Sequence, residues 1–163
     1  MNKTQKPFLK EYLPYLMFRT HSLMTTRLYE AIKQQGYTRA EWRILSTLSD
    51  NEHKQGMTIN QLVKATQLPQ PTVSRWITKL HEKGLIMRLE SNNDLRHRLV
   101  TLSAKGKKSA ETLIEIADSH QADAVSVFSR TDLNKLIAML QEMVSGLEEE
   151  DERRNRIGKR RLS

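Results

Sequence analysis

The polar side chains of a helix predicted at residues 70–83 form a pattern that suits contact with nucleic acid. Val73, Ile77 and Leu80 recur at helical spacing and should face inward, with Trp76 on the flank. The outward-facing positions are assigned to short side chains and two cations, without a carboxylate: Gln70, Pro71, Thr72, Ser74, Arg75, Thr78 and Lys79. Such groups reach base edges and phosphates, and Arg75 is best placed to reach a phosphate or a guanine. The alternative is an ordinary solvated helix face.

A shorter helix precedes this one and is joined to it by a tight turn. Thr58 is a suitable N-cap, and an apolar stripe at helical spacing follows it at 59–63. Gln67-Leu68-Pro69 ends this first helix, because a residue before proline is displaced from helical φ and ψ. Pro71 suits the first turn of the second helix and Gly84 its C′ position. The two helices therefore predict a helix-turn-helix.

Two short apolar runs, at 85–87 and 99–102, follow the helix-turn-helix. Ser91-Asn92-Asn93-Asp94 between them has turn-forming composition, and Arg96-His97-Arg98 comes next. The order of helix, turn, helix and a hairpin with a cationic tip predicts a winged helix-turn-helix.

Positive charge is concentrated on this winged segment. The chain carries a formal net charge of +8, and residues 58–106 hold eight Lys or Arg against three Asp or Glu. Residues 107–147 hold four against six, so the helices after the wing are acidic. Cations that neutralise phosphates release counterions, so this distribution favours a polyanion as partner. A basic solvated surface is the alternative.

This order of elements resembles the MarR family of bacterial transcription regulators, over roughly residues 12–147. The segment TVSRWITKLHEKGLI at 72–86 is similar to the family's recognition helix and its Gly-Leu exit. Asp94-Leu95-Arg96 with the downstream VTLSAKG at 100–106 is similar to the D-x-R wing and its end. Long helices before and after the winged segment complete the resemblance. It implies a mostly α fold with a small β-wing, in which a winged head at 56–104 is carried on a helical dimerisation bundle.

The resemblance also implies roles for charged residues of the wing. Arg96 matches the arginine of the D-x-R motif and would enter the minor groove, where A·T-rich steps have the deepest negative potential. Asp94 would orient its guanidinium, and Arg98 would add a further cation. A salt bridge within the hairpin is the alternative.

The helices that flank the head predict a second copy of the chain. Pro14 and Gly36 delimit a helix at 14–35, and Thr38 with Glu41 forms a capping box for the next helix. Helices at 104–127 and, after Ser129, through 133–147 follow the wing. Both flanking regions carry more apolar surface than one head buries, so a two-fold homodimer is expected, as in the family.

The predicted organisation is a single MarR-like domain over 1–163. Residues 8–36 and 105–152 are assigned to dimerisation, and 153–163 to a basic tail. The like-charge blocks from 148 onward are expected to be disordered or a fraying helix. Contact of the basic end with DNA is the functional alternative to a solvated tail.

MarR proteins typically bind small, often aromatic anions between the dimer helices and the winged head. The resemblance suggests that the pocket for such an effector would be lined here by Phe18, Arg19, His21, Trp42 and Arg43. Core packing is the more ordinary role for Phe18 and Trp42.

Several functional classes are excluded or disfavoured by composition. The chain has no cysteine, which excludes disulfides, thiolate metal sites and thiol-based sensing. Its five histidines show no i, i+3 or i, i+4 pair, and no catalytic motif or phosphate-cradling glycine loop occurs. No cofactor, metal site or enzymatic activity is therefore expected. Without a long apolar run or a signal peptide pattern, we expect no membrane association and a cytoplasmic, nucleoid-associated protein.

The sequence and the resemblance together predict a regulator that binds double-stranded DNA sequence-specifically. Its expected form is a homodimeric repressor on an inverted-repeat operator, released by a small aromatic or anionic effector. One alternative is a winged-helix adaptor that binds protein or RNA. Another is a small enzyme or helical adaptor with an incidental basic face.

Overall fold

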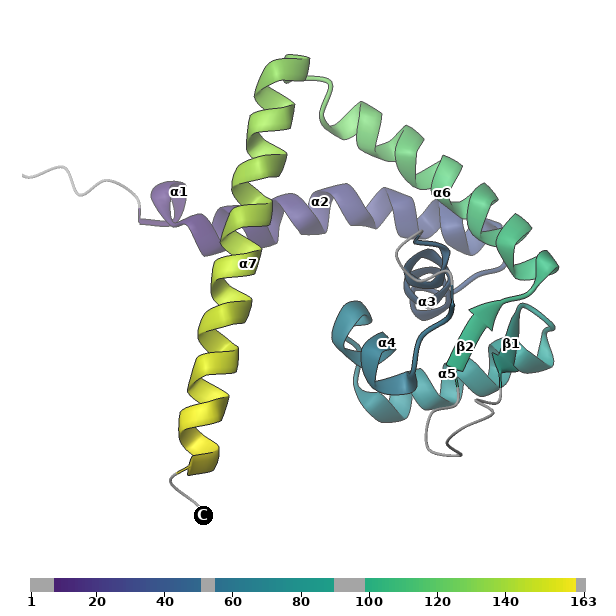
Figure 1. Ribbon diagram of the computed structural model, residues 1–163. Helices are drawn as coiled ribbons and strands as arrows, with labels where there is room; N and C mark the ends of the chain where they lie inside the picture. The colour runs from purple at the N-terminus through teal and green to yellow at the C-terminus, as the bar shows by residue number, and fades with distance from the viewer. Residues whose placement is uncertain (1–7, 51–54, 90–98, 161–163) are drawn as a thin grey trace, which may run out of the picture. The chain divides into compact units, whose positions relative to one another are not determined.

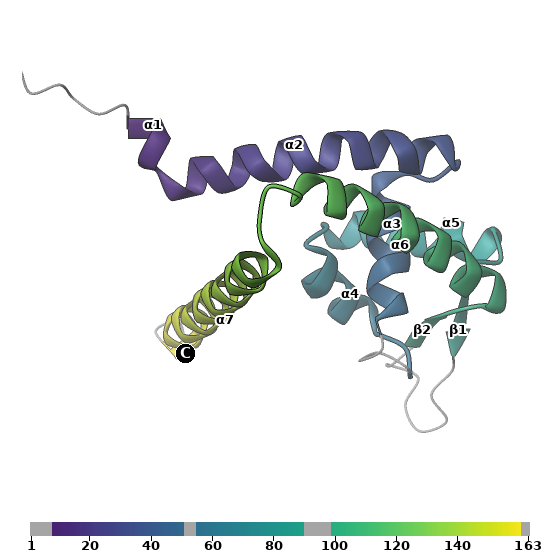
Figure 2. The same ribbon diagram turned by 90° about the horizontal axis from the view of Figure 1, so that it is seen from above.

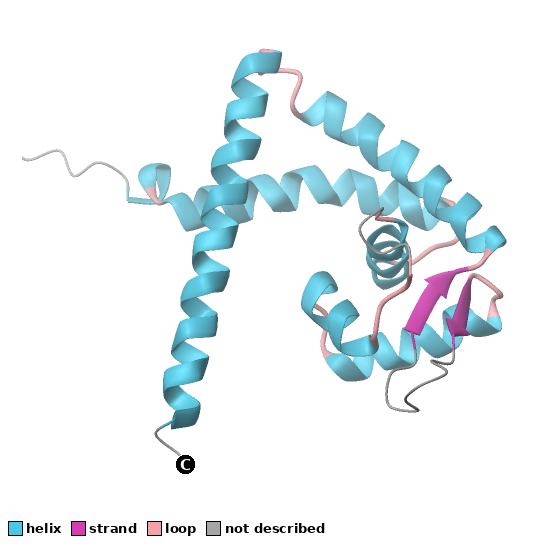
Figure 3. Ribbon diagram, viewed as in Figure 1, coloured by secondary structure: helices cyan, strands magenta, loops and turns pink. Residues whose placement is uncertain are grey.

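The computed structural model describes residues 8–50, 55–89 and 99–160. The chain divides into two compact units, Met1–Gln121 and Ala122–Ser163, and each is considered by itself. The described residues are mostly helical, with one two-stranded sheet (Figure 3). The predicted fold class, mostly α with a small β-wing, is confirmed.

The first unit contains all the predicted elements of the head and the helices next to it (Figure 1). In chain order these are α1 (Phe8–Glu11), α2 (Leu13–Gln34), α3 (Arg39–Ser49), α4 (Ile59–Thr66), α5 (Gln70–Glu82), β1 (Ile86–Leu89), β2 (Leu99–Leu102) and α6 (Ala104–Ala124), whose last three residues fall in the second unit. α2 is a single unbroken helix of 22 residues (Figure 2), which corresponds to about 33 Å.

Local capping explains where these helices begin and end. Thr38 and Glu41 form the predicted capping box of α3, and Thr58 forms a second box with Gln61 at the start of α4. α4 ends where Gln67 adopts a left-handed conformation, with φ of 53°, one residue earlier than the proline rule suggests. Gly84, with φ of 70°, follows the C-cap of α5 as predicted.

The hydrophobic core is built around α3, which lies between α2 on one side and α4 and α5 on the other (Figure 1). β1 and β2 pair antiparallel, with Ile86 opposite Leu102 and Arg88 opposite Val100. The buried apolar residues come from every element of the first unit except α1: Ile32, Ile44, Leu45, Leu48, Met57, Leu62, Val73, Ile77, Leu80, Leu85, Ile86, Val100, Leu102, Ala110 and Leu113.

The junction of β2 and α6 is fixed by Ser103 and Gly106. The Ser103 hydroxyl donates to the carbonyl of Gly84 at 2.7 Å and accepts from the Gly106 N–H at 2.9 Å. The first turn of α6 thereby lies against the turn that follows α5. A Cβ at Gly106 would overlap the carbonyl oxygen of Leu85.

The second unit contains α7 (Arg130–Arg160), which begins with Ser129 hydrogen-bonded to Asp132. Of the two expectations for the blocks from 148 onward, disorder is wrong as far as Arg160, because α7 continues to that residue. Glu150 and Arg154 form an ion pair at i, i+4, with the acid N-terminal to the base. This order is the favourable one, so the acidic block stabilises the basic block that follows. No helix among the described residues is long and apolar enough to cross a bilayer.

Gly106→Ala should destabilise the protein, because the added methyl group meets backbone that cannot rotate away. We expect a loss of about 3 kcal/mol, the upper end for inserting a methyl group into a closed site, measured by urea denaturation. Gly146→Ala in α7 is the matched control, since no described atom beyond the adjacent turns of its own helix lies within 4 Å of its Cβ position. It should be neutral or gain up to about 1 kcal/mol of helix propensity. Equal effects of the two substitutions would contradict this account of Gly106.

Candidate nucleic-acid interface

The outer face of α5 presents the polar side chains that the sequence pattern assigns to it. Val73, Ile77 and Leu80 are buried as predicted, which turns the opposite face outward. The exposed residues are Gln70, Pro71, Arg75, Thr78 and Lys79, and the half-buried ones are Thr72 and Ser74. The seven candidate positions therefore share one accessible surface, on the side of α5 away from α3.

Trp76 lies between the two cations of this surface. Lys79 Nζ is 4.8 Å from the centre of the indole ring, and Arg75 Cζ is 5.9 Å from it. An aromatic face attracts a cation at such distances. The ring, which packs partly against the core, therefore favours a position of the Lys79 ammonium, and more weakly of the Arg75 guanidinium, beside its face.

The same surface also contains a carboxylate, which corrects the expected absence of acids. Glu82 is exposed and follows Thr78 by four residues, so it lies on the same helical stripe. Its charge opposes binding of a polyanion at this end of α5. The favourable part of the surface is thus its N-terminal and middle turns, with Arg75 and Lys79.

The wing contributes one cation that the helix pattern could not assign. Arg88 on β1 donates from Nη2 to Thr78 Oγ1 at 3.1 Å, which joins the wing to the outer face of α5. The predicted run at 85–87 ends one residue before Arg88, whereas β1 extends to Leu89 and places Arg88 on the same face as Ile86. Asp94, Arg96 and Arg98 lie outside the described residues, so their roles stay predictions.

A fully buried carboxylate fixes the far end of α5 to α3. Glu41 Oε2 accepts the Thr38 N–H at 2.7 Å, and Oε1 accepts from Lys83 Nζ at 2.5 Å. Lys83 is the C-cap residue of α5, and its carbonyl accepts from Lys105 Nζ at 3.0 Å. The start of α3, the end of α5 and the start of α6 therefore meet at this ion pair.

The pKa of Glu41 reflects two opposing effects. Burial raises the pKa, whereas the Lys83 ammonium and the hydrogen bonds from Thr38 lower it. The lowering effects outweigh burial, and the pKa of Glu41 lies below its usual 4.5. The carboxylate is consequently charged at neutral pH although it is buried.

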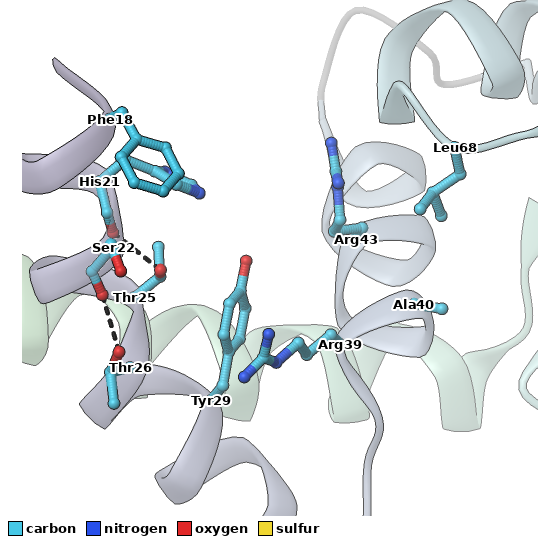
Figure 4. Close-up of a pocket in the computed structure, with 10 residues that line it drawn as sticks. All are labelled: Phe18, His21, Ser22, Thr25, Thr26, Tyr29, Arg39, Ala40, Arg43 and Leu68. Carbon is cyan, nitrogen blue, oxygen red and sulfur yellow. Dashed lines mark hydrogen bonds between the residues drawn. The ribbon is translucent and has the colours of Figure 1, made fainter. Parts of the chain in front are cut away.

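A cavity of about 500 Å³ separates α2 from α3 (Figure 4). Phe18, His21 and Tyr29 line the α2 wall, and Arg39 and Arg43 the α3 wall. The remaining lining residues are Ser22, Thr25, Thr26, Ala40 and Leu68. The Arg39 guanidinium stacks over the Tyr29 ring, 4.3 Å from its centre. Leu68 belongs to the turn between α4 and α5, so the cavity also touches the segment that leads into α5.

Three of the five residues suggested for an effector pocket line this cavity, namely Phe18, His21 and Arg43. The ordinary alternative of core packing does not hold for Phe18, which is 70% exposed. It does hold for Trp42, which packs against the core. Arg19 is not among the lining residues and donates to Tyr15 Oη at 3.1 Å. Sequence reasoning missed Tyr29 and Arg39, because nothing in their helical spacing distinguishes them from other surface positions.

Comparison with known proteins identifies the group to which the chain belongs. A model of the MarR family matches residues 35–97, which cover α3, α4, α5 and β1. A MarR family transcriptional regulator of Silicibacter pomeroyi superposes with a TM-score of 0.77 and 28% identity, over 88% of this chain and 95% of that one. This chain belongs to the MarR family.

Two further relatives of this MarR protein are informative. S. aureus MepR, in a crystal structure of its DNA complex, is 30% identical with a TM-score of 0.68, over 82% of this chain and 96% of MepR. The homoprotocatechuate degradative operon repressor of Escherichia coli is 26% identical over 117 residues, which cover 70% of this chain and 75% of the repressor. The protein is thus a DNA-binding transcription regulator of the MarR family and not an enzyme. Within the described residues no group of three His, Asp or Glu gathers as a metal site would require.

The Glu41–Lys83 pair predicts how the stability of this MarR protein depends on pH. Because the pKa of Glu41 is lowered on folding, its contribution is complete above 4.5 and is lost as the pH falls below that value. Glu41→Gln should therefore reduce stability at pH 7, by about 1–2 kcal/mol for the lost charged hydrogen bonds. It should also flatten the decline of the unfolding free energy in acid.

The measurement is urea denaturation of the parent and of Glu41→Gln, from pH 7 to below pH 4.5. Glu82→Gln is the matched control, since it removes an exposed carboxylate from the last turn of α5. It should leave the acid dependence of the parent nearly unchanged. An identical pH dependence in the parent and in Glu41→Gln would show that the buried pair contributes nothing to acid sensitivity.

Proposed function

We propose that this MarR protein is a homodimeric repressor that binds an inverted-repeat operator and is released by a small anionic ligand. The observation that carries the DNA-binding part is the outer face of α5, where Arg75 and Lys79 flank Trp76. The DNA complex of MepR, a relative of 30% identity, supports the same role for the matching elements. Binding DNA implies a cytoplasmic, nucleoid-associated protein.

In this proposal α5 enters the major groove and the wing reaches the neighbouring minor groove. Arg75 contacts a guanine or a phosphate, while Thr72 and Ser74 contact the backbone or a thymine methyl group. Gln70, Pro71, Thr78 and Lys79 complete the surface on the helix. Asp94, Arg96 and Arg98 are assigned to the wing contact, with Arg96 in the minor groove.

Exposed apolar side chains outside the head support the homodimer. On α1, on α2 and at the junction between them they are Phe8, Leu9, Tyr12, Leu13, Leu16, Phe18 and Leu23, and on α7 they include Ile137, Met139, Leu140, Val144 and Leu147. Each set exceeds the scattered apolar residues of an ordinary monomer surface. We assign 8–36 and 105–152 to dimerisation and 153–163 to a basic tail, within a single domain. A two-fold dimer would present two α5 helices to half-sites about 34 Å apart.

The cavity between α2 and α3 supports the effector. Its volume suits a small molecule, and it combines two aromatic rings, Phe18 and Tyr29, with two guanidinium groups, Arg39 and Arg43. This lining favours a small aromatic carboxylate, and the name of the E. coli relative also refers to an aromatic acid. α3 carries both the arginines and Glu41, so a ligand that moves α3 also acts on Lys83 at the end of α5. Release then requires that the ligand prefer the arrangement that binds DNA poorly.

Arg75→Ala should weaken binding to a specific operator and relax the sequence preference at the position that Arg75 contacts. The experiment is selection from random duplex DNA with the parent, Arg75→Ala and Lys108→Ala, the last being exposed on the polar face of α6. We expect the parent and Lys108→Ala to enrich an inverted repeat, because a two-fold dimer reads its half-sites symmetrically. Loss of Arg75 should cost about 1–3 kcal/mol on that operator.

Other outcomes of the selection point to other functions. An enriched sequence without two-fold symmetry would contradict the dimer, and binding without enrichment would contradict the operator. Absence of duplex binding even at low salt would favour the winged-helix adaptor that binds protein or RNA.

Small aromatic carboxylates should bind the cavity and displace the operator. A panel of benzoate derivatives should raise the Tm of the parent, by an amount that grows with ligand concentration, and should weaken operator binding in the same order. The corresponding benzamides are the matched controls, since they lack the charge that Arg39 and Arg43 would neutralise. Arg43→Ala should reduce the shift. Equal shifts with acids and amides would contradict an anion site.

A further inference from the structure

Arg88 occupies a position in the wing from which its side chain reaches α5. It lies opposite Val100 in the register of β1 and β2, and it follows Ile86 by two residues. Side chains two residues apart point to the same face of a strand. Ile86 and Val100 are both buried against the helices, so Arg88 leaves the sheet on the side of α5 but remains exposed beyond the core.

Thr78 receives the Arg88 guanidinium and is itself fixed by α5. Its hydroxyl donates to the carbonyl of Ser74 at 3.3 Å and accepts from Arg88 Nη2 at 3.1 Å. A hydroxyl has a single proton to donate. Because that proton is donated to the Ser74 carbonyl, the Thr78 hydroxyl can only accept from groups outside the helix. It therefore has no proton to donate to a phosphate oxygen. The donor at this point of the surface is the guanidinium.

We propose that Arg88 binds a phosphate of the DNA backbone at the edge of the groove that α5 enters, and that Thr78 positions it. The proposal rests on the proposed function, and it changes the role of Thr78 from a DNA contact to a support for one. Arginine has five N–H donors in a planar fork, and a phosphate accepts two of them side by side. A hydrogen bond from one nitrogen to Thr78 fixes the plane of the fork and leaves donors for this contact.

The Arg88 side chain lies between β1 and α5, and this position determines where on the surface a phosphate would be bound. Arg75 and Lys79 lie on α5 beside Trp76, whereas Arg88 comes from the sheet and reaches the helix at Thr78. The contact therefore extends the cationic surface from the helix to the root of the wing. It also lies one turn before Glu82, whose carboxylate limits how far along α5 a phosphate backbone is tolerated.

The test measures duplex affinity by fluorescence anisotropy over a range of KCl concentrations, with the selected operator and a random-sequence duplex. A phosphate contact weakens binding to both duplexes to a similar extent and contributes about 1 to the slope of log K against log[salt]. Arg88→Ala should therefore lower the slope by about 2 on each duplex, about 1 from each protomer of the proposed dimer. Arg88→Lys should retain the slope, because the charge remains, but bind less tightly, because the fork is lost.

Thr78→Val tests the positioning role, since it removes the hydroxyl at nearly constant volume. It should weaken binding in the parent but have no further effect in the Arg88→Ala background, because Thr78 acts through Arg88. Lys108→Ala is the matched control, because it removes a cation from the polar face of α6. It should leave the slope of log K against log[salt] unchanged. Thermal melting of every variant reports whether it is folded.

The outcomes separate the inference from the proposed function. If the parent binds DNA and Arg88→Ala shows the same salt dependence as the parent, the phosphate contact is overturned but the proposed function is not. A lower Tm of that variant would then show that Arg88 holds the wing on α5. If the losses of binding free energy caused by Thr78→Val and Arg88→Ala are additive in the double variant, the positioning role of Thr78 is overturned. A parent that binds neither duplex at low salt overturns the proposed function and the contact together.

Discussion

Glu41 lies fully buried in the first turn of α3, where its carboxylate meets the Thr38 N–H and the Lys83 ammonium. Removal of a charge from water costs several kcal/mol unless a partner and hydrogen bonds compensate for it. The start of α3 and the end of α5 are therefore held together, because their separation would leave the carboxylate buried without its cation. The orientation of α5, and with it the direction in which Arg75 and Lys79 point, depends on this one contact and on the apolar residues below it.

The same helix, α3, connects the cavity with the end of α5, the helix that we propose binds DNA. Arg39 and Arg43 line the cavity from α3, and Glu41 lies between them in the sequence. At the other end of α5, Leu68 touches the cavity from the turn between α4 and α5. The turn before α5 thus lines the cavity, and the far end of α5 contacts Glu41, which lies on α3 between two lining residues. A short path of this kind needs no long-range network, because a single packed helix transmits the displacement.

Local patterns predicted much of the fold. The capping box of Thr38 and Glu41, the inward triad of α5 and the left-handed Gly84 each follow from a few neighbouring residues, so the sequence shows them directly. Contacts between distant residues could not be derived in this way. The Glu41–Lys83 and Thr78–Arg88 contacts depend on how α3 packs on α5 and on the register of the wing, which helical periodicity does not encode. Like-charge blocks taken one at a time predict disorder after residue 148, whereas their four-residue offset pairs Glu150 with Arg154. Glu82 lies beyond Lys79, the last residue of the predicted polar pattern.

The close approach of Gly106 to Leu85 gives α6 a mechanical property. With Ser103 bonded to Gly84 and no room for even a methyl group beneath the first turn, α6 has no freedom to slide or pivot where it leaves the wing. These contacts fix the first turn of α6 to the head, so the helix would act as a lever arm if the head tilted. Its 21 residues correspond to about 30 Å. A tilt of the head by about 5° would therefore sweep the distal end of α6 through roughly 3 Å, an amplification that comes from helix length alone.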